Sequence, residues 1–280
     1  MKKVLTFIFV LVFNVQVHAG LLYSADGRIS VHPDVQGSGD LPRYSVDWRD
    51  PITLPVPPDY TGNNGRISAD GRVISGQLFY YDKNNNIMTD MRAAIWEQTE
   101  VVDTIPYYSE PRLLPSLQEG QFNMTSDMSP TGEYITGHCI LGQSTGNYQA
   151  VYWDQNRDVH SLGSMYYDST LYNHSTSCNV RNDNTIFGIT WSGEGGGGTL
   201  AFIWDEQHGI RYLKDVLEQE YGYNFGDAVL ESVHFLDPDG TNIYGNAYNP
   251  TGTLLHWTAT IPEPATLLIL GLGVLCLRHR

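Results

Sequence analysis

A short acidic turn near the end of the chain is the stretch whose residue types best fit metal chemistry. The segment Asp237-Pro-Asp239-Gly-Thr-Asn242 gathers carboxylate and amide oxygens, the hard ligands that calcium prefers. The alternative is an ordinary Asp-Gly turn, in which these side chains accept hydrogen bonds from the backbone. A second acidic stretch, residues 82–86, begins like an EF-hand loop but lacks the glycine and the glutamate that such a loop requires. Calcium at Asp237, Asp239 and Asn242 is therefore the one cofactor that the sequence suggests.

Motifs for covalent catalysis lack the surroundings that they need. Gly142-Gln-Ser144-Thr-Gly146 spells the G-x-S-x-G of a hydrolase, but that motif must be followed by a helix, and residues 148–153 have the pattern of a strand. The glycine run 193–198 lacks the Lys-Ser/Thr of a phosphate loop. The histidines show no paired spacing that would bind zinc. We therefore expect no catalytic residue and no enzyme activity; the alternative is a glycosidase that uses two carboxylates.

The elements that would position any such site form a repeat. Asp70-Gly-Arg-Val-Ile74-Ser-Gly76 recurs in related form at 131–137, 182–188 and 239–245. Each copy is followed by a second apolar strand that ends in tryptophan, at Trp96, Trp153, Trp204 and Trp257. A degenerate first copy begins at Asp26 and ends its second strand at Trp48. The five tryptophans are 48, 57, 51 and 53 residues apart, and Trp191 lies outside the pattern.

Equal spacing with three or four short strands in each unit is typical of a β-propeller. We expect an all-β fold of about five blades over residues 20–260, with the tryptophans packed between blades. The last copy is one strand short, and residues 21–24 are expected to supply that strand and close the ring. Residues 212–221 are the one helical candidate. The units resemble the HAF-type extracellular repeats of bacterial exported proteins, a resemblance that implies a propeller-like fold and no activity.

The N-terminus has the three parts of a secretory signal peptide. Met1-Lys2-Lys3 is basic, residues 4–13 are apolar, and Val17-His18-Ala19 offers small residues before a cleavage point. We expect residues 1–19 to be removed, with the cut between Ala19 and Gly20.

The C-terminal segment 261–280 begins with the breaker Pro262-Glu263-Pro264. Thirteen uncharged residues follow and then Arg278-His-Arg280. At about 1.5 Å per residue this single hydrophobic helix would be about 20 Å long, shorter than the roughly 30 Å of a bilayer core. The arginines suit the cytoplasmic side of a membrane and can snorkel. We expect a marginal, temporary membrane anchor.

These three parts of the tail resemble the PEP-CTERM sorting signal of Gram-negative bacteria. The resemblance implies that the precursor is held in the inner membrane until an exosortase removes the tail. It also implies export to the cell surface or beyond, in organisms that make extracellular polysaccharide.

Charge, cysteine content and tyrosine content limit the kinds of partner and cross-link that the chain can have. The formal net charge of −15 argues against binding to nucleic acid. Cys276 leaves with the tail, and in an exported protein Cys139 and Cys178 could form a disulfide; the alternative is two separate buried thiols. The 18 tyrosines fit either a carbohydrate-binding surface or simple β propensity. We therefore expect an exported binding or structural module of a polysaccharide matrix.

Overall fold

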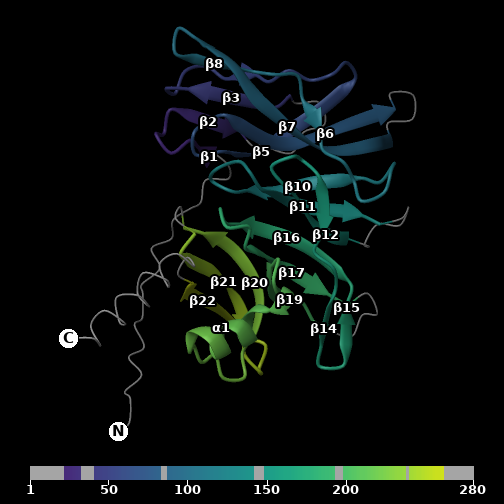
Figure 1. The fold of residues 1–280 in the computed structure, drawn as a ribbon, viewed down its shortest axis with the longest axis vertical. Helices are drawn as coiled ribbons and strands as arrows, with labels where there is room; N and C mark the ends of the chain where they lie inside the picture. The colour runs from purple at the N-terminus through teal and green to yellow at the C-terminus, as the bar shows by residue number, and fades with distance from the viewer. Residues whose placement is uncertain are drawn as a thin grey trace, which may run out of the picture.

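The computed structural model describes residues 22–32, 41–82, 87–141, 148–192, 198–237 and 240–261. These residues form successive antiparallel sheets, which lie face to face along the molecule (Figure 1). The predicted all-β fold is confirmed. We number the five larger sheets in chain order, as sheet 1 to sheet 5.

Sheets 1 to 3 are formed by the first half of the chain. Sheet 1 contains β1 (Leu22–Tyr23), β2 (Ile29–His32), β3 (Arg43–Val46) and β4 (Ile52–Thr53). Sheet 2 contains β5 (Tyr60–Ile67), β6 (Val73–Asp82), β7 (Ile87–Val102), β8 (Ile105–Tyr108) and β9 (Arg112–Leu113). Sheet 3 contains β10 (Asn123–Met128), β11 (Ile135–Ile140), β12 (Tyr148–Trp153) and β13 (Val159–Ser161).

The second half begins with a small hairpin, β14 (Met165–Tyr167) and β15 (Thr170–Tyr172). Sheet 4 contains β16 (His174–Val180), β17 (Ile186–Trp191), β18 (Leu200–Asp205) and β19 (Gly209–Tyr212). The helix α1 (Leu213–Tyr221) follows, where a helix was expected. Sheet 5 contains only β20 (Val229–Leu236), β21 (Asn242–Tyr248) and β22 (Leu254–Thr260).

The tryptophans of the middle sheets occupy equivalent places. Trp96 pairs with Ile74, and Trp153 pairs with Ile135. Both tryptophans are fully buried. Each indole Nε1 donates to a proline carbonyl in the segment that follows the previous sheet, at 2.7 Å to Pro55 and at 2.8 Å to Pro115. Trp204 pairs with Ile186 in the same register and is also buried. These three tryptophans therefore pack between sheets, as predicted.

Of the tryptophans in the two end sheets, Trp48 departs from the prediction, whereas Trp257 packs between sheets but in a shifted register. Trp48 lies in the turn after β3 with φ +61° and is 72% exposed. Trp257 is buried, but it pairs with Gly245, and Ala259 stands opposite Ile243 instead. A Cβ atom on Gly245 would lie 2.5 Å from the Trp257 ring. The ring therefore fills the space that the missing side chain leaves.

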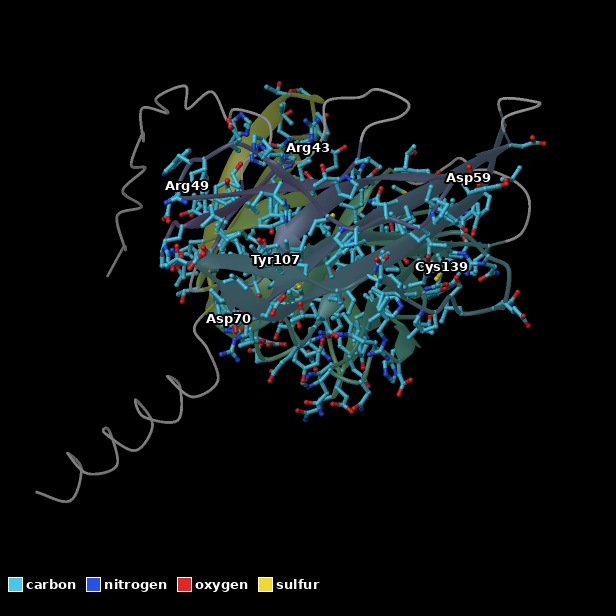
Figure 2. All side chains as sticks on the ribbon, turned by 90° about the horizontal axis from the view of Figure 1, so that it is seen from above. Arg43, Arg49, Asp59, Asp70, Tyr107 and Cys139 are labelled. Atoms are coloured by element: carbon cyan, nitrogen blue, oxygen red, sulfur yellow. The ribbon has the colours of Figure 1, made fainter. Side chains whose placement is uncertain are left out.

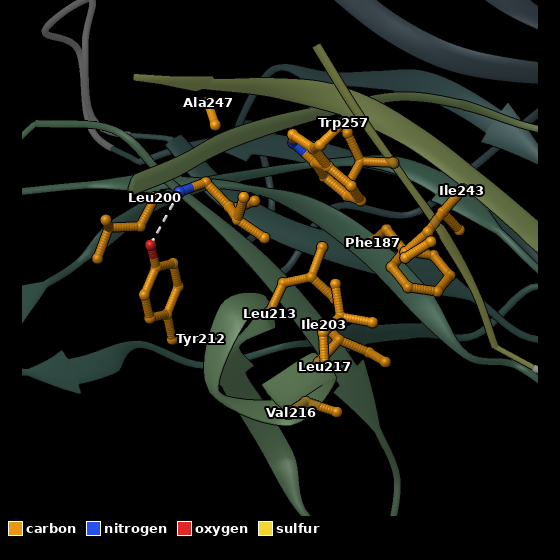
Figure 3. Packing of buried hydrophobic residues seen from close by; sticks show 14 of the residues in the cluster. Phe187, Leu200, Ile203, Tyr212, Leu213, Val216, Leu217, Ile243, Ala247 and Trp257 are labelled. Atoms are coloured by element: carbon orange, nitrogen blue, oxygen red, sulfur yellow. Dashed lines mark hydrogen bonds between the residues drawn. The ribbon is translucent and has the colours of Figure 1, made fainter. Parts of the chain in front are cut away.

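Four apolar clusters join the sheets in sequence. The first lies between sheets 1 and 2, the second between sheets 2 and 3, and the third between sheets 3 and 4. The largest joins sheet 4, α1 and sheet 5 (Figure 3). In it, Leu213, Val216 and Leu217 form the buried face of α1, with the i, i+3, i+4 spacing of an amphipathic helix. Within the described part of the chain, no cluster joins sheet 5 to sheet 1.

The predicted closure of a ring by residues 21–24 is wrong. β1 pairs with β2 in sheet 1, so the N-terminal strand is not added to sheet 5. The loop after α1 lies against the free edge of β22. The Thr260 amide of β22 donates to Oη of Tyr223 in this loop at 2.7 Å. Phe225 of this loop packs edge-on against Trp257. A loop thus lies where a fourth strand was expected. Among the described residues no helix is both long and apolar enough to cross a membrane.

Candidate functional site: a pocket lined by the first strands of sheets 2 to 5

The turn that joins the first two strands is built alike in successive sheets. In sheet 2, Ser68 Oγ donates to Asp70 Oδ1 at 2.7 Å and accepts from the Val73 amide at 3.0 Å. In sheet 1, Ser24 Oγ makes the same two bonds, to Asp26 at 2.6 Å and from the Ile29 amide at 3.0 Å. These side chains satisfy backbone groups that would otherwise lack a partner, as expected of polar turn residues.

In sheet 5 the calcium candidate occupies this same turn. Asp237 takes the place of the serine, and its Oδ1 accepts from the Asn242 amide at 3.0 Å. Its Oδ2 accepts from the Asn242 side-chain amide, and Asn242 Oδ1 accepts from Thr260 Oγ1 at 2.7 Å. The described oxygens therefore close the turn, as in the Asp-Gly alternative. Asp239 lies outside the described residues. Across the described ranges, no group of three or more His, Cys, Asp or Glu side chains could hold a metal ion.

Each first strand of sheets 2 to 5 also carries a one-residue bulge, three positions before its turn. The unpaired residues are Gly65, Ser126, Cys178 and His234. A bulge bends its strand and re-aims the side chain that follows. The residues directly after these bulges are Arg66, Asp127, Asn179 and Phe235, from four different sheets. All four line one pocket with a volume of about 250 Å³.

Three of these residues are linked by hydrogen bonds centred on Asp127. Arg66 Nε donates to Asp127 Oδ1 at 2.7 Å. Asp127 Oδ2 accepts from the Val180 amide at 3.2 Å and from Asn179 Nδ2 at 3.4 Å. Burial raises the pKa of Asp127, while the guanidinium of Arg66 opposes this shift by favouring the charged carboxylate. The bonds therefore tie sheets 2, 3 and 4 together at the pocket wall.

The fourth residue supplies an apolar wall. Phe235 is 53% exposed, and its ring stacks on Tyr244 with 4.4 Å between centroids and 13° between planes. Aromatic rings beside planar polar groups suit a ligand that has both apolar and hydroxyl-bearing faces. The pocket can therefore stack and hydrogen-bond a small polar group.

Comparison with known proteins adds one motif and one fold. Residues 260–280 match the family model described as the PEP-CTERM protein-sorting motif. The C-terminal tail is a PEP-CTERM sorting signal. This signal implies processing by an exosortase, export, and transient passage through a membrane. No curated protein matches the chain.

Among solved structures, a TolB-type protein from Agrobacterium tumefaciens has a TM-score of 0.51 at 12% identity. The match covers 86% of this chain and 76% of that one. TolB from Acinetobacter baumannii has a TM-score of 0.41 at 16% identity, covering 86% of this chain and 49% of that one. The first likeness shows an all-β, TolB-like fold, and TolB-like structures are of the β-propeller type. It carries no information about a ligand.

The sorting residues of the PEP-CTERM signal lie outside the described residues, which end at Ile261. They are Pro262, Glu263, Pro264, Arg278 and Arg280. The predicted cleavage point at Ala19 and Gly20 and the candidate nucleophile Ser144 also lie outside. The signal peptide and the likeness to HAF-type repeats stay predictions.

Of the two alternatives for Cys139 and Cys178, the structure has the separate thiols and not the disulfide, because both cysteines are free. Cys139 on β11, which is labelled in Figure 2, belongs to the apolar cluster between sheets 2 and 3. Cys178 occupies the bulge of β16 in sheet 4, beyond sheet 3. A bridge requires side chains that face each other, and these two belong to different layers. Burial raises the pKa of both thiols, that of Cys178 to about 11, so both stay protonated and unreactive at neutral pH.

Of the pocket residues, only Asp237 was singled out from the sequence, as a calcium candidate. Arg66, Asp127, Asn179 and Phe235 share no residue type, so motif matching does not connect them. Their common feature is position, since each lies two residues before the first residue of a repeated turn. Aligning the repeats from those turns backward would have grouped them.

Proposed function

We propose that this chain is an exported, non-catalytic propeller module that an exosortase system sorts to the cell surface, where it binds extracellular polysaccharide. In this proposal residues 1–19 are removed on export, residues 20–260 form the functional body, and residues 261–280 form the sorting tail. The exosortase and, transiently, the inner membrane are its partners during sorting. The observation that carries the proposal is the match of residues 260–280 to the PEP-CTERM motif.

The pocket supports binding rather than turnover. A glycosidase of the usual kind needs two carboxylates, one that donates a proton and one that attacks or activates water. Two aspartates line the pocket, but Asp127 is paired with Arg66 and Asp237 holds the turn at Asn242. Each carboxylate is thus engaged with the protein. An exposed aromatic ring and an amide beside them suit a bound sugar.

The glycosidase alternative is favoured by one observation, which is the raised pKa of Asp127. A carboxyl group that keeps its proton more readily is what a general acid requires. In this alternative Asp127 would protonate the leaving oxygen, and the second carboxylate would have to come from Asp237 after its turn opens.

One experiment separates these two functions. The processed protein, purified from cells that sort it, is incubated with the exopolysaccharide of those cells and with soluble glucans. Binding without release of reducing ends supports the module, whereas release of reducing ends that Asp127→Asn abolishes supports the enzyme.

A second experiment tests the sorting. Replacing Arg278 and Arg280 with glutamate should leave the protein unprocessed or mislocalised in fractionated cells, because positive charge at this position fixes the orientation of the tail. Arg49→Glu, at an exposed position in the body, is the control and should be processed normally. Unchanged processing of the tail variant would contradict the proposal.

A further inference from the structure

The face of sheet 5 that points away from sheet 4 is left uncovered by the described residues. Successive residues of a strand point to opposite faces, and paired residues on neighbouring strands share a face. The strand pairings therefore place these residues on what we call the open face: Val229, Ser232, Phe235, Asn242, Tyr244, Asn246, Tyr248, Leu254, His256, Thr258 and Thr260. All are partly or fully exposed.

The composition of the open face differs from that of an ordinary sheet interface. Its middle row is polar, with Asn246 Oδ1 and His256 Nδ1 2.8 Å apart across the strands. At one end lies the stacked pair of Phe235 and Tyr244, and at the other lies Tyr248, which is 39% exposed. Stable interfaces between protein copies have a largely apolar centre. This face has a polar row at its centre and an aromatic ring in the row on either side, with the polar pair Asn242 and Thr260 beyond Tyr244.

Charge narrows the ligand further. The chain has a formal net charge of −15, yet no position of the open face carries Asp or Glu. Glu231, the acidic residue nearest to it in β20, lies at a bulge instead. Such a face gains no ion pairs from a strongly charged ligand, and the surrounding acidic protein repels an anionic one. A neutral ligand that is rich in hydroxyl groups needs no ion pairs and is not repelled by the acidic protein.

We infer that the open face of sheet 5 is the platform on which the chain binds a neutral polysaccharide, an inference that rests on the proposed function and names its ligand class and surface. Tyr244 and Tyr248 are four residues apart on β21, or about 13 Å at the usual rise of about 3.3 Å per residue. Sugar rings stack on the aromatic side chains at the two ends, and their hydroxyl groups bond with Asn246 and His256 between them. Because Phe235 also lines the pocket, the platform and the pocket are continuous.

The test measures binding of the processed protein to dextran, to a soluble β-glucan and to the neutral exopolysaccharide of the producing cells, with alginate as the acidic comparison. Tyr248→Ala is expected to weaken the binding of a neutral polysaccharide at least tenfold, and Tyr248→Phe to keep it, because stacking needs the ring and not the hydroxyl. Tyr166→Ala is the matched control, since Tyr166 is 71% exposed on the separate β14–β15 hairpin. It should bind within twofold of the unchanged protein.

The outcomes separate this inference from the proposed function. Neutral binding that Tyr248→Ala leaves unchanged overturns the platform but keeps the function. Binding of alginate alone overturns the ligand class named here. Absence of binding to every polysaccharide overturns both. A dimer that Tyr248→Ala dissociates would show that the open face binds a second copy, and would also overturn the inference.

Discussion

Sheet 3 and sheet 5 carry the same repeat in two different settings. Sheet 3 is packed on both faces, and its Trp153 and Ile135 are fully buried in the expected register. Sheet 5 is packed on one face, and its tryptophan is displaced by two residues to cover Gly245. The comparison shows that the pairing of tryptophan with isoleucine is kept in a sheet that packs against two neighbouring sheets. It is shifted in a sheet that packs against only one. We place the ligand on the open face of sheet 5.

The largest loss of stability is expected from a substitution in a sheet that is packed on both faces. Trp153→Ala should lower the free energy of unfolding by about 3–5 kcal/mol, because it removes a large side chain from a closed core. Trp48→Ala, in the exposed turn of an end sheet, should change it by less than about 0.5 kcal/mol. Chemical denaturation of both variants measures the difference. Equal losses would contradict the contrast between middle and end sheets.

A pH-dependent effect should come from His138 of sheet 3. Burial lowers the pKa of His138 to about 4 from its usual 6.5, so the folded state favours the neutral ring. Stability is therefore full above pH 6.5, falls as the pH drops from 6.5 to 4 while the unfolded chain takes up the proton, and is constant below that. The loss from this group is up to about 3 kcal/mol. Denaturation of the unchanged protein and of His138→Gln across this range would show the difference, and identical pH profiles would contradict the assignment.

A smaller effect is expected from the glycine of the repeated strand. A Cβ atom on Gly137 would lie 1.8 Å from the carbonyl oxygen of Met124, so Gly137→Ala must push neighbouring strands apart. We expect a loss of about 1–3 kcal/mol from such overpacking. Gly198→Ala is the control, because no atom lies within 4 Å of its Cβ position. If the Gly137→Ala and Gly198→Ala proteins have the same melting temperature, sheet 3 is packed more loosely than described.

The smallest effect on stability should come from the open face. Tyr248→Ala should change the free energy of unfolding by less than about 0.5 kcal/mol, because its side chain covers no core. Ile243→Ala, on the opposite face of the same strand, should cost about 2–5 kcal/mol. Thermal melting of the two proteins checks this. A large loss from Tyr248→Ala would mean that the open face is packed.

The parts of the fold that could be predicted from the sequence are those set by local pattern. Asp70-Gly71 and its counterparts mark hairpin turns, and the apolar strands around them alternate as sheets require. The displacement of Trp257 could not be predicted, because a shift of two residues keeps a side chain on the same face of its strand. Closure of a ring depends on contacts between the two ends of the chain, which no local pattern contains.

All of the candidate site except Asp237 was missed for a related reason. Sequence patterns pointed to Asp237 and Asn242, whose oxygens resemble a metal site when read in order. In the fold they hold a turn, while Arg66, Asp127, Asn179 and Phe235 meet only because four bulges aim side chains from four sheets at one place. Bulges depend on the pairing between strands, so their positions cannot be predicted from the residue composition.

Hydrogen exchange of the processed protein with and without a neutral polysaccharide tests the central claim most directly. We predict slower exchange in β21 and β22, no release of reducing ends, and unchanged exchange in sheet 3. Protection confined to sheets other than sheet 5 would contradict binding on the open face, and cleavage of the polysaccharide during the measurement would contradict binding without turnover.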